Sequence, residues 1–313
     1  MPEYGSTERH PFISLIFLLL LLLAGTIVFT ILGGVAGAAL YGTTDVLKFF
    51  TGNFSNNLNL TKLMQIFSAT GMFIVPALAF ARIESRNWKK YLKFNSASII
   101  LFLLVLFIMF SSGPLMELSV AINEKMKLPA FLRDMEIWMR NQEDQLAELT
   151  KQLLTMNNFG DLAVNLLMLA IIPAIGEELI FRGSLQKLFN KMTGNYHVAI
   201  WITAIIFSAF HMQFYGFLPR MFLGAMFGYL LVWSNSIWIP ILAHFVNNGV
   251  AVFTAYYYQR QGISLEKLDQ AQSYSAIFYV ISAVLTAALL WLFYTRSFKQ
   301  QQIITDDNGA RLG

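Results

Sequence analysis

Three charged residues interrupt a long apolar stretch near the middle of this chain, in the segment "AIIPAIGEELIFRGSL" at residues 170–185. Glu178 and Arg182 lie four positions apart with the acid first, which is the favourable orientation for an ion pair on a helix. Glu177 lies about 100° around the helix from Glu178, so we expect it to have no partner on this helix. An unpaired carboxylate can accept a proton from water, which makes Glu177 a candidate general base.

A histidine in the next apolar segment is predicted to lie at the same depth as Glu177. Gly194 marks a turn, and Glu177 and His211 lie 17 residues before and after it. In an antiparallel helical hairpin, equal distances from the turn place two residues at the same height along the helices. We therefore predict that Glu177 faces His211, and by the same count that Phe207 lies at the level of Phe181.

A third polar cluster lies in "LAHFVNN", where His244 and Asn248 are four positions apart and share one helical face. The surrounding segment is apolar, so both side chains are predicted to lie within the bilayer. Pro240 and Pro173 stand four residues before His244 and Glu177, and each is predicted to kink its helix.

These residue types fit the activation of water for hydrolysis of an amide bond. Glu177 and His211 together could activate the water, and His244 and Asn248 could donate hydrogen bonds to the developing oxyanion. Alternatively, Glu177, His211 and His244 could give zinc three ligands and leave a fourth position open for water. The helical zinc-protease pattern His-Glu-x-x-His is absent, so no cofactor is assigned and zinc stays an alternative.

The composition is that of a polytopic membrane protein. Of the 313 residues, 56% are hydrophobic and 13% are charged, about half the charged share of a soluble domain. The chain has no cysteine, which excludes a disulfide, a thiol nucleophile and a thiolate metal site. The fold class is predicted to be all-α, with about eight transmembrane helices in the lipid bilayer. These lie near residues 12–34, 62–81, 97–113, 162–190, 196–213, 217–233, 237–258 and 274–295.

Short basic loops set the predicted orientation in the membrane. The loop at 82–94 holds five Lys or Arg residues and one Glu, and further basic residues follow the fourth and eighth spans. With eight spans, these loops and both termini fall on one side, which is predicted to be the cytoplasm. The net charge of +4 comes from these loops rather than from one basic face, so no nucleic-acid partner is predicted.

The chain is predicted to have three parts. Residues 1–159 hold the N-terminal spans and an insertion at 114–160, residues 160–260 hold the core with the polar clusters, and residues 261–313 hold the last span and a short cytoplasmic tail. In the insertion, apolar residues recur at helical spacing between charges, which predicts amphipathic helices on the outer surface. A solvated linker or lid is the alternative.

The polar clusters also form an ordered set of motifs between residues 160 and 260, namely Glu177-Glu178-x-x-x-Arg182, Phe207-x-x-x-His211 and His244-x-x-x-Asn248. In order and spacing, this set resembles the motifs of the CAAX-protease and bacteriocin-processing (CPBP) intramembrane protease family. That family includes the type II CAAX prenyl endopeptidases and the bacterial abortive-infection proteins. The first three spans and the insertion carry no such resemblance.

The resemblance implies an all-helical membrane core with a conical cavity and an endopeptidase activity. It assigns Glu177 with His211 as the general base and His244 with Asn248 as the oxyanion site, supported by Glu178, Arg182 and Phe207. Some members are described as metalloproteases, so it leaves the need for zinc open. It places the protein in the bacterial cytoplasmic (inner) membrane as a multi-pass hydrolase. We do not extend the prenylated CAAX substrate to this chain.

The sequence therefore predicts a CAAX-protease-like intramembrane endopeptidase of the glutamate or metallo type. Its substrate is predicted to be a membrane-associated protein or peptide. A proton-coupled transporter is one alternative, although no internal repeat relates the two halves of the chain. A non-catalytic scaffold or regulator with the protease fold is another, although no Glu or His of the motifs is missing.

Overall fold

The structure is a computed structural model that describes residues 9–54, 56–268 and 274–310. Within these ranges all regular secondary structure is helical and there is no strand. Seven helical segments are long and apolar enough to span a membrane, namely Pro11–Tyr41, Leu58–Glu84, Ile99–Glu124, Phe159–Thr193, Phe217–Ser234, Trp238–Arg260 and Ala276–Phe298. The predicted fifth span corresponds to α11 (Tyr196–Phe210), which is shorter. The prediction of an all-α polytopic membrane protein is confirmed.

The first half of the chain forms three of the long segments and two surface helices. Its elements are α1 (Pro11–Tyr41), α2 (Thr43–Phe50), α3 (Leu58–Ala69), η1 (Thr70–Ile74), α4 (Val75–Glu84), α5 (Trp88–Tyr91), α6 (Ile99–Glu124), η2 (Ala130–Leu132) and α7 (Arg133–Leu153). The second half contains α8 (Phe159–Leu166), η3 (Leu167–Ile171), α9 (Ile172–Ile180), η4 (Phe181–Leu185), α10 (Gln186–Thr193), α11, α12 (Phe217–Ser234), α13 (Trp238–Arg260), η5 (Leu265–Leu268) and α14 (Ala276–Ala310).

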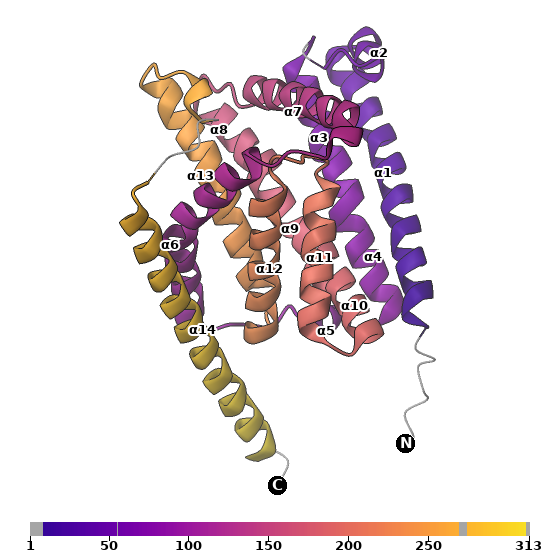
Figure 1. The fold of residues 1–313 in the computed structure, drawn as a ribbon. Helices are drawn as coiled ribbons and strands as arrows, with labels where there is room; N and C mark the ends of the chain where they lie inside the picture. The colour runs from indigo at the N-terminus through magenta and orange to yellow at the C-terminus, as the bar shows by residue number, and fades with distance from the viewer. Residues whose placement is uncertain (1–8, 55, 269–273, 311–313) are drawn as a thin grey trace.

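The surface helices and the ends of the long helices lie at two opposite ends of the bundle. Helix α1 begins and α14 ends at the end that also holds α5, whereas α2 and α7 lie at the other end (Figure 1). The basic loop at 82–94, which contains α5, therefore lies at the same end as the outer ends of the first and last spans. This grouping agrees with the predicted topology, but the side that faces the cytoplasm stays a prediction.

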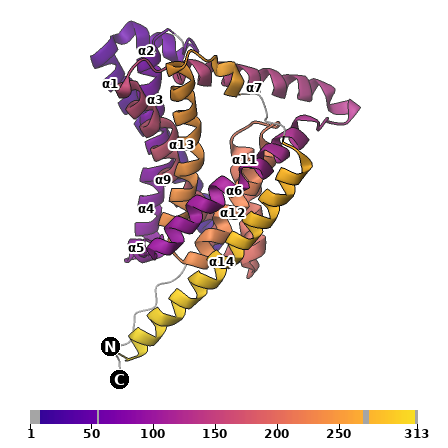
Figure 2. The same cartoon turned by 90° about the vertical axis from the view of Figure 1, so that its left-hand side faces the viewer.

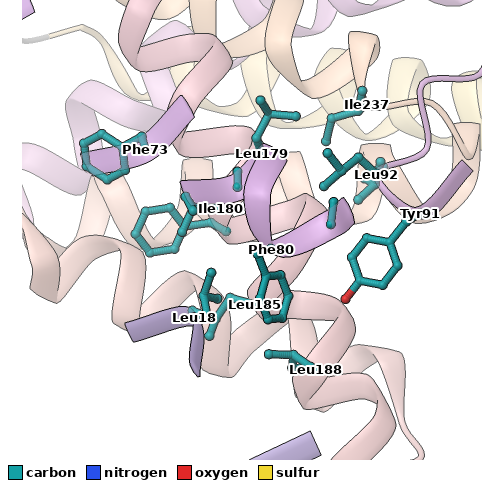
Figure 3. Packing of buried hydrophobic residues seen from close by; sticks show 14 of the residues in the cluster. Leu18, Phe73, Phe80, Tyr91, Leu92, Leu179, Ile180, Leu185, Leu188 and Ile237 are labelled. Carbon is teal, nitrogen blue, oxygen red and sulfur yellow. The ribbon is translucent and has the colours of Figure 1, made fainter. Parts of the chain in front are cut away.

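A buried apolar cluster fixes the helix that carries the two glutamates. Leu18 of α1, Phe80 of α4, Leu179 of α9 and Leu185 of η4 belong to one core cluster, part of which is drawn in Figure 3. In a bilayer, where lipid is as apolar as leucine, close van der Waals packing of such side chains holds the helices together. Glu177 and Glu178 therefore lie on a well-packed helix and not on a loop.

Three π-helical turns interrupt the long helices, and none of them was predicted. The turns η1 and η3 are each followed within two residues by a proline, Pro76 and Pro173, which lacks a backbone N–H. The third, η4, begins directly after α9. The kink predicted at Pro240 is wrong, because α13 begins at Trp238 and places this proline in the first turn, where a helix needs no N–H donor.

The predicted insertion at 114–160 contains the end of α6 and the whole of α7. Helix α6 continues through Pro114 to Glu124, so the third span extends into the insertion. The amphipathic helix expected further on is α7. Trp138 on this helix is exposed, as is Phe131 in η2 just before it. Helix α7 crosses one end of the bundle (Figure 2).

Close packing of α9 gives a stability prediction at Gly176. A Cβ atom added there would lie 2.6 Å from Phe73 Cβ and 3.2 Å from Ile74 Cγ1, so Gly176→Ala forces α9 away from η1. We expect it to cost about 1–3 kcal/mol of stability and to lower the melting temperature in detergent. The control is Gly113→Ala in α6, where nothing lies within 4 Å of the added atom. Equal melting temperatures for the two variants would contradict this account.

Candidate active site

The ion pair predicted between Glu178 and Arg182 is present and fully buried. Arg182 Nη1 lies 2.8 Å from Glu178 Oε1, and both side chains are 0% exposed. Arg182 Nη2 donates a second hydrogen bond of 3.0 Å to the Gly224 carbonyl of α12. The guanidinium carbon lies 4.5 Å from the ring centre of Phe207 and 5.4 Å from that of Phe227. The pair is thus neutralised and enclosed by aromatic rings, while Glu178 Oε2 and Arg182 Nε have no hydrogen-bond partner among the described residues.

His244 is held by this same pair. Its Nδ1 atom lies 2.8 Å from Glu178 Oε1, and its ring stacks on Phe227 with 5.5 Å between ring centres. Because a carboxylate only accepts hydrogen bonds, Nδ1 carries a proton and donates it to Glu178. The other ring nitrogen, Nε2, lies 3.9 Å from Glu177 Oε2. Glu178 therefore sets both the orientation and the tautomer of the ring that faces Glu177.

Glu177 has the unsatisfied carboxylate that the sequence predicts. Its side chain is 12% exposed, and its Oε2 atom is buried without a hydrogen-bond partner among the described residues. At 3.9 Å, the contact with His244 is too long for a hydrogen bond. This carboxylate is therefore able to accept a hydrogen bond from a water molecule or a substrate.

Among the described residues, the structure shows no direct bond between His211 and Glu177, and the prediction that the two face each other stays a prediction. His211 follows the last residue of α11, and its Nδ1 atom lies 2.9 Å from the Phe207 carbonyl. No hydrogen bond or ion pair joins it to Glu177 in the described ranges, and Glu177 approaches His244 instead. The prediction rests on equal depth in the hairpin, and equal depth does not by itself bring two side chains into contact.

The depth argument holds one turn away from this pair. The rings of Phe181 and Phe207 were predicted to lie at one level, and they meet edge to face with 5.1 Å between their centres. The Phe207 ring also lies 5.1 Å from the His211 ring and 6.0 Å from the His244 ring. Phe207 therefore lies beside both histidines and over the guanidinium of Arg182.

Asn248 forms a bond that was not predicted. Its Nδ2 atom donates to the carbonyl of Leu169 in η3 at 3.1 Å. The residue four places after Leu169 is Pro173, which has no N–H to offer this carbonyl. Asn248 thus satisfies a backbone acceptor beside α9 and retains one further amide hydrogen.

The donor set does not form a metal site in this arrangement. Across the described ranges, no group of three or more His, Cys, Asp or Glu side chains lies close enough to hold a metal ion. Glu177 and His244 approach each other at 3.9 Å, and no third His or Glu side chain completes a ligand cluster with them in the described ranges. The zinc alternative therefore finds no preformed ligand set, and no step of the mechanism below uses it.

Arg220 near the start of α12 is a charged residue that the sequence interpretation missed. It lies within electrostatic reach of Glu177 and also of Glu143 on the surface helix α7. The signal was an arginine at the edge of an apolar segment, in "GFLPRMFLGAMF". Arginine in such a place costs several kcal/mol unless it has partners.

Comparison with known proteins concerns the segment that holds these residues. Residues 159–250 match the family model described as Type II CAAX prenyl endopeptidase Rce1-like. This segment is therefore similar to the Rce1-like family. The resemblance predicted from the three motifs is thereby confirmed, and the matched range begins with α8 and includes most of α13.

Two curated relatives align with similar lengths of chain. The "Uncharacterized protein YpbD" of Bacillus subtilis is 26% identical over 90 residues, which are 28% of this chain and 43% of the relative. The "Membrane-embedded CAAX protease MroQ" of Staphylococcus aureus is 33% identical over 89 residues, which are 26% of this chain and 36% of the relative. The similarity thus spans less than half of either relative. No solved structure matches the chain.

Proposed function

We propose that this protein is an intramembrane endopeptidase that hydrolyses a peptide bond of a membrane-associated protein or peptide. The observation that carries the proposal is the unsatisfied Glu177 carboxylate beside His244, whose ring is fixed by the buried Glu178–Arg182 pair. This arrangement lies within the segment that matches the CAAX endopeptidase model. A multi-pass membrane location follows from the long apolar helices.

The proposed reaction begins with Glu177 as general base. Its carboxylate takes a proton from water as the water oxygen attacks the substrate carbonyl carbon. We assign His211 to hold the same water, because Nδ1 is already bound to the Phe207 carbonyl and Nε2 is the nitrogen left to accept a hydrogen bond. Water attack forms a tetrahedral intermediate whose oxygen carries a negative charge.

His244 and Asn248 are proposed to stabilise that oxyanion. In this proposed role His244 carries a hydrogen on both ring nitrogens, so that Nδ1 keeps its bond to Glu178 while Nε2 donates to the oxyanion. Asn248 has one amide hydrogen beyond the one bound to Leu169. Collapse of the intermediate breaks the C–N bond, and Glu177 returns its proton to the leaving amine.

The function is tested by comparing membrane peptides. Membranes are collected from cells that express the wild-type protein, Glu177→Ala or Glu124→Ala, the last being an exposed glutamate at the end of α6. We expect at least one peptide product that is present with the wild type and Glu124→Ala and missing with Glu177→Ala. Identical peptide sets in all three samples would contradict the proposal and favour the transporter or scaffold alternatives.

The role of metal gives a separate prediction. Because the described Glu and His side chains form no three-ligand cluster, we expect purified protein to contain no stoichiometric zinc. Cleavage of the identified peptide should be the same with and without a chelator such as 1,10-phenanthroline. Loss of cleavage with the chelator and recovery on adding zinc would show that the ligands rearrange around a metal.

A further inference from the structure

The surface helix α7 holds one residue of the turn that follows His211. The Tyr215 backbone N–H donates to Glu143 Oε1 at 2.9 Å, and the Tyr215 hydroxyl donates to Glu136 Oε1 at 3.2 Å. The guanidinium carbon of Arg140 lies 4.1 Å from the centre of the Tyr215 ring. Three side chains on successive turns of α7 thus bind one tyrosine by three different kinds of contact.

The far end of α7 is anchored to the helices that carry the site. The Leu153 carbonyl accepts a 2.9 Å hydrogen bond from the buried amide of Asn165 in α8. The next carbonyl, that of Leu154, accepts one of 2.9 Å from Gln259 in α13. Helix α7 therefore connects α8 and α13 with the turn after α11 across the end of the bundle (Figure 2).

The turn itself has little regular structure of its own. It begins directly after His211 with Met212, whose φ of 53° lies in the left-handed region that disfavours a side chain. Asn123, fully buried in α6, donates to the Phe214 carbonyl at 2.8 Å and accepts from the Leu218 N–H at 2.6 Å. The position of the turn is thus determined by contacts from α6 and α7 and not by regular secondary structure within the turn.

Arg220 connects this attachment with the proposed site. Its side chain is bonded to Gln213 in the turn and lies within electrostatic reach of both Glu143 on α7 and Glu177 on α9. Burial raises the pKa of the Glu143 carboxyl, while the Tyr215 N–H and the charges of Arg220 and Arg140 oppose this shift. Arg220 is thus the cation between the surface helix and the candidate general base.

We propose that α7 is a positioning strap for the active site, and that Glu143 and Tyr215 are positioning residues that hold His211 in place. The inference rests on the proposed function for its consequence, although the attachment itself can be measured without a substrate. Helix α7 lies outside the Rce1-like segment. The strap is thus a contribution of the rest of this chain to the histidine of the second motif.

The test uses the full-length protein in detergent and three variants of α7. Glu143→Ala removes the acceptor for the Tyr215 N–H, Glu143→Gln keeps an acceptor oxygen, and Asp144→Ala changes an exposed neighbour as the matched control. Three quantities are measured: amide hydrogen exchange in residues 212–217, modification of His211 by diethyl pyrocarbonate, and cleavage of the peptide identified with Glu177→Ala.

We expect Glu143→Ala to speed amide exchange at Tyr215 by about tenfold, as loss of one hydrogen bond predicts, and to speed modification of His211. Cleavage should fall by about tenfold through a lower kcat with little change in KM, because misplacement of a reacting group slows the chemical step. Glu143→Gln should return amide exchange, His211 modification and cleavage most of the way to their wild-type rates. Asp144→Ala should match the wild type in all three.

Two results would overturn the strap. The first is that Glu143→Ala and Asp144→Ala have the same rates of amide exchange and of His211 modification. This result would show that α7 does not hold the turn. The other is faster exchange with His211 modification and cleavage unchanged, which would show that the turn does not position His211. If Glu177→Ala leaves the membrane peptides unchanged, the proposed function fails, and the exchange and modification rates still decide whether α7 positions His211.

Discussion

Replacing Glu177 with alanine is expected to lower the rate of peptide cleavage by at least about a hundredfold while the protein stays folded. The side chain is 12% exposed, and its Oε2 atom has no hydrogen-bond partner in the described ranges, so little stability depends on it. Without the carboxylate, the proposed acceptor for the proton of the attacking water is lost. We expect the same loss in Glu177→Gln, because an amide cannot act as a base at neutral pH.

The measurement is the cleavage rate of the identified peptide by purified protein, together with the melting temperature of each variant. Glu124→Ala provides the control for loss of one carboxylate at an exposed position. Full cleavage by Glu177→Gln would show that Glu177 is not the general base. A large fall in the melting temperature of Glu177→Ala would mean that the carboxylate serves the fold rather than the reaction.

Features that depend on one helix, or on counting residues from a marked turn, were predicted well from the sequence. The Glu178–Arg182 pair follows from four-residue spacing and is present at 2.8 Å. The all-α membrane fold follows from apolar length alone. The level of Phe181 and Phe207 follows from counting back to Gly194, and their rings are in contact. Such features need only the constant geometry of a helix.

Features that depend on how helices meet were not predicted. The bond between His244 and Glu178 requires the relative height of α13 and α9, which are 66 residues apart at these positions. The π turns change residue counts along a helix, and they coincide with tertiary contacts such as Asn248 on the Leu169 carbonyl. The position of Glu177 beside His244 follows from the way α9 and α13 meet.

The attachment of Tyr215 to α7 was hidden for a different reason. Periodicity identified α7 as an amphipathic helix, but no partner within the chain was assigned to its charged residues. Glu136 and Glu143 are separated from Tyr215 by 79 and 72 residues. No spacing rule relates side chains so far apart, so only the folded structure reveals that they bind the turn after His211.

Arg182→Ala is expected to have the second large effect, on stability as well as on activity. It removes the partner of a fully buried carboxylate, a change that costs about 3–5 kcal/mol in buried ion pairs. It also leaves the Gly224 carbonyl without its 3.0 Å donor and removes the cation from the rings of Phe207 and Phe227. We expect a strongly lowered yield and melting temperature, measured in detergent against Arg133→Ala, an exposed arginine on α7.

A double variant separates the two roles of the pair. In Glu178→Leu/Arg182→Met no unpaired charge remains, and replacing a buried ion pair with apolar residues is often neutral for stability. We therefore expect the double variant to regain most of the melting temperature lost in Arg182→Ala. Cleavage should stay lost, because His244 no longer has the Glu178 oxygen that holds its Nδ1 at 2.8 Å. A double variant that cleaves like the wild type would show that Glu178 does not orient the histidine. If Arg182→Ala melted at the temperature of Arg133→Ala, the pair would not be needed to accommodate the carboxylate in the membrane.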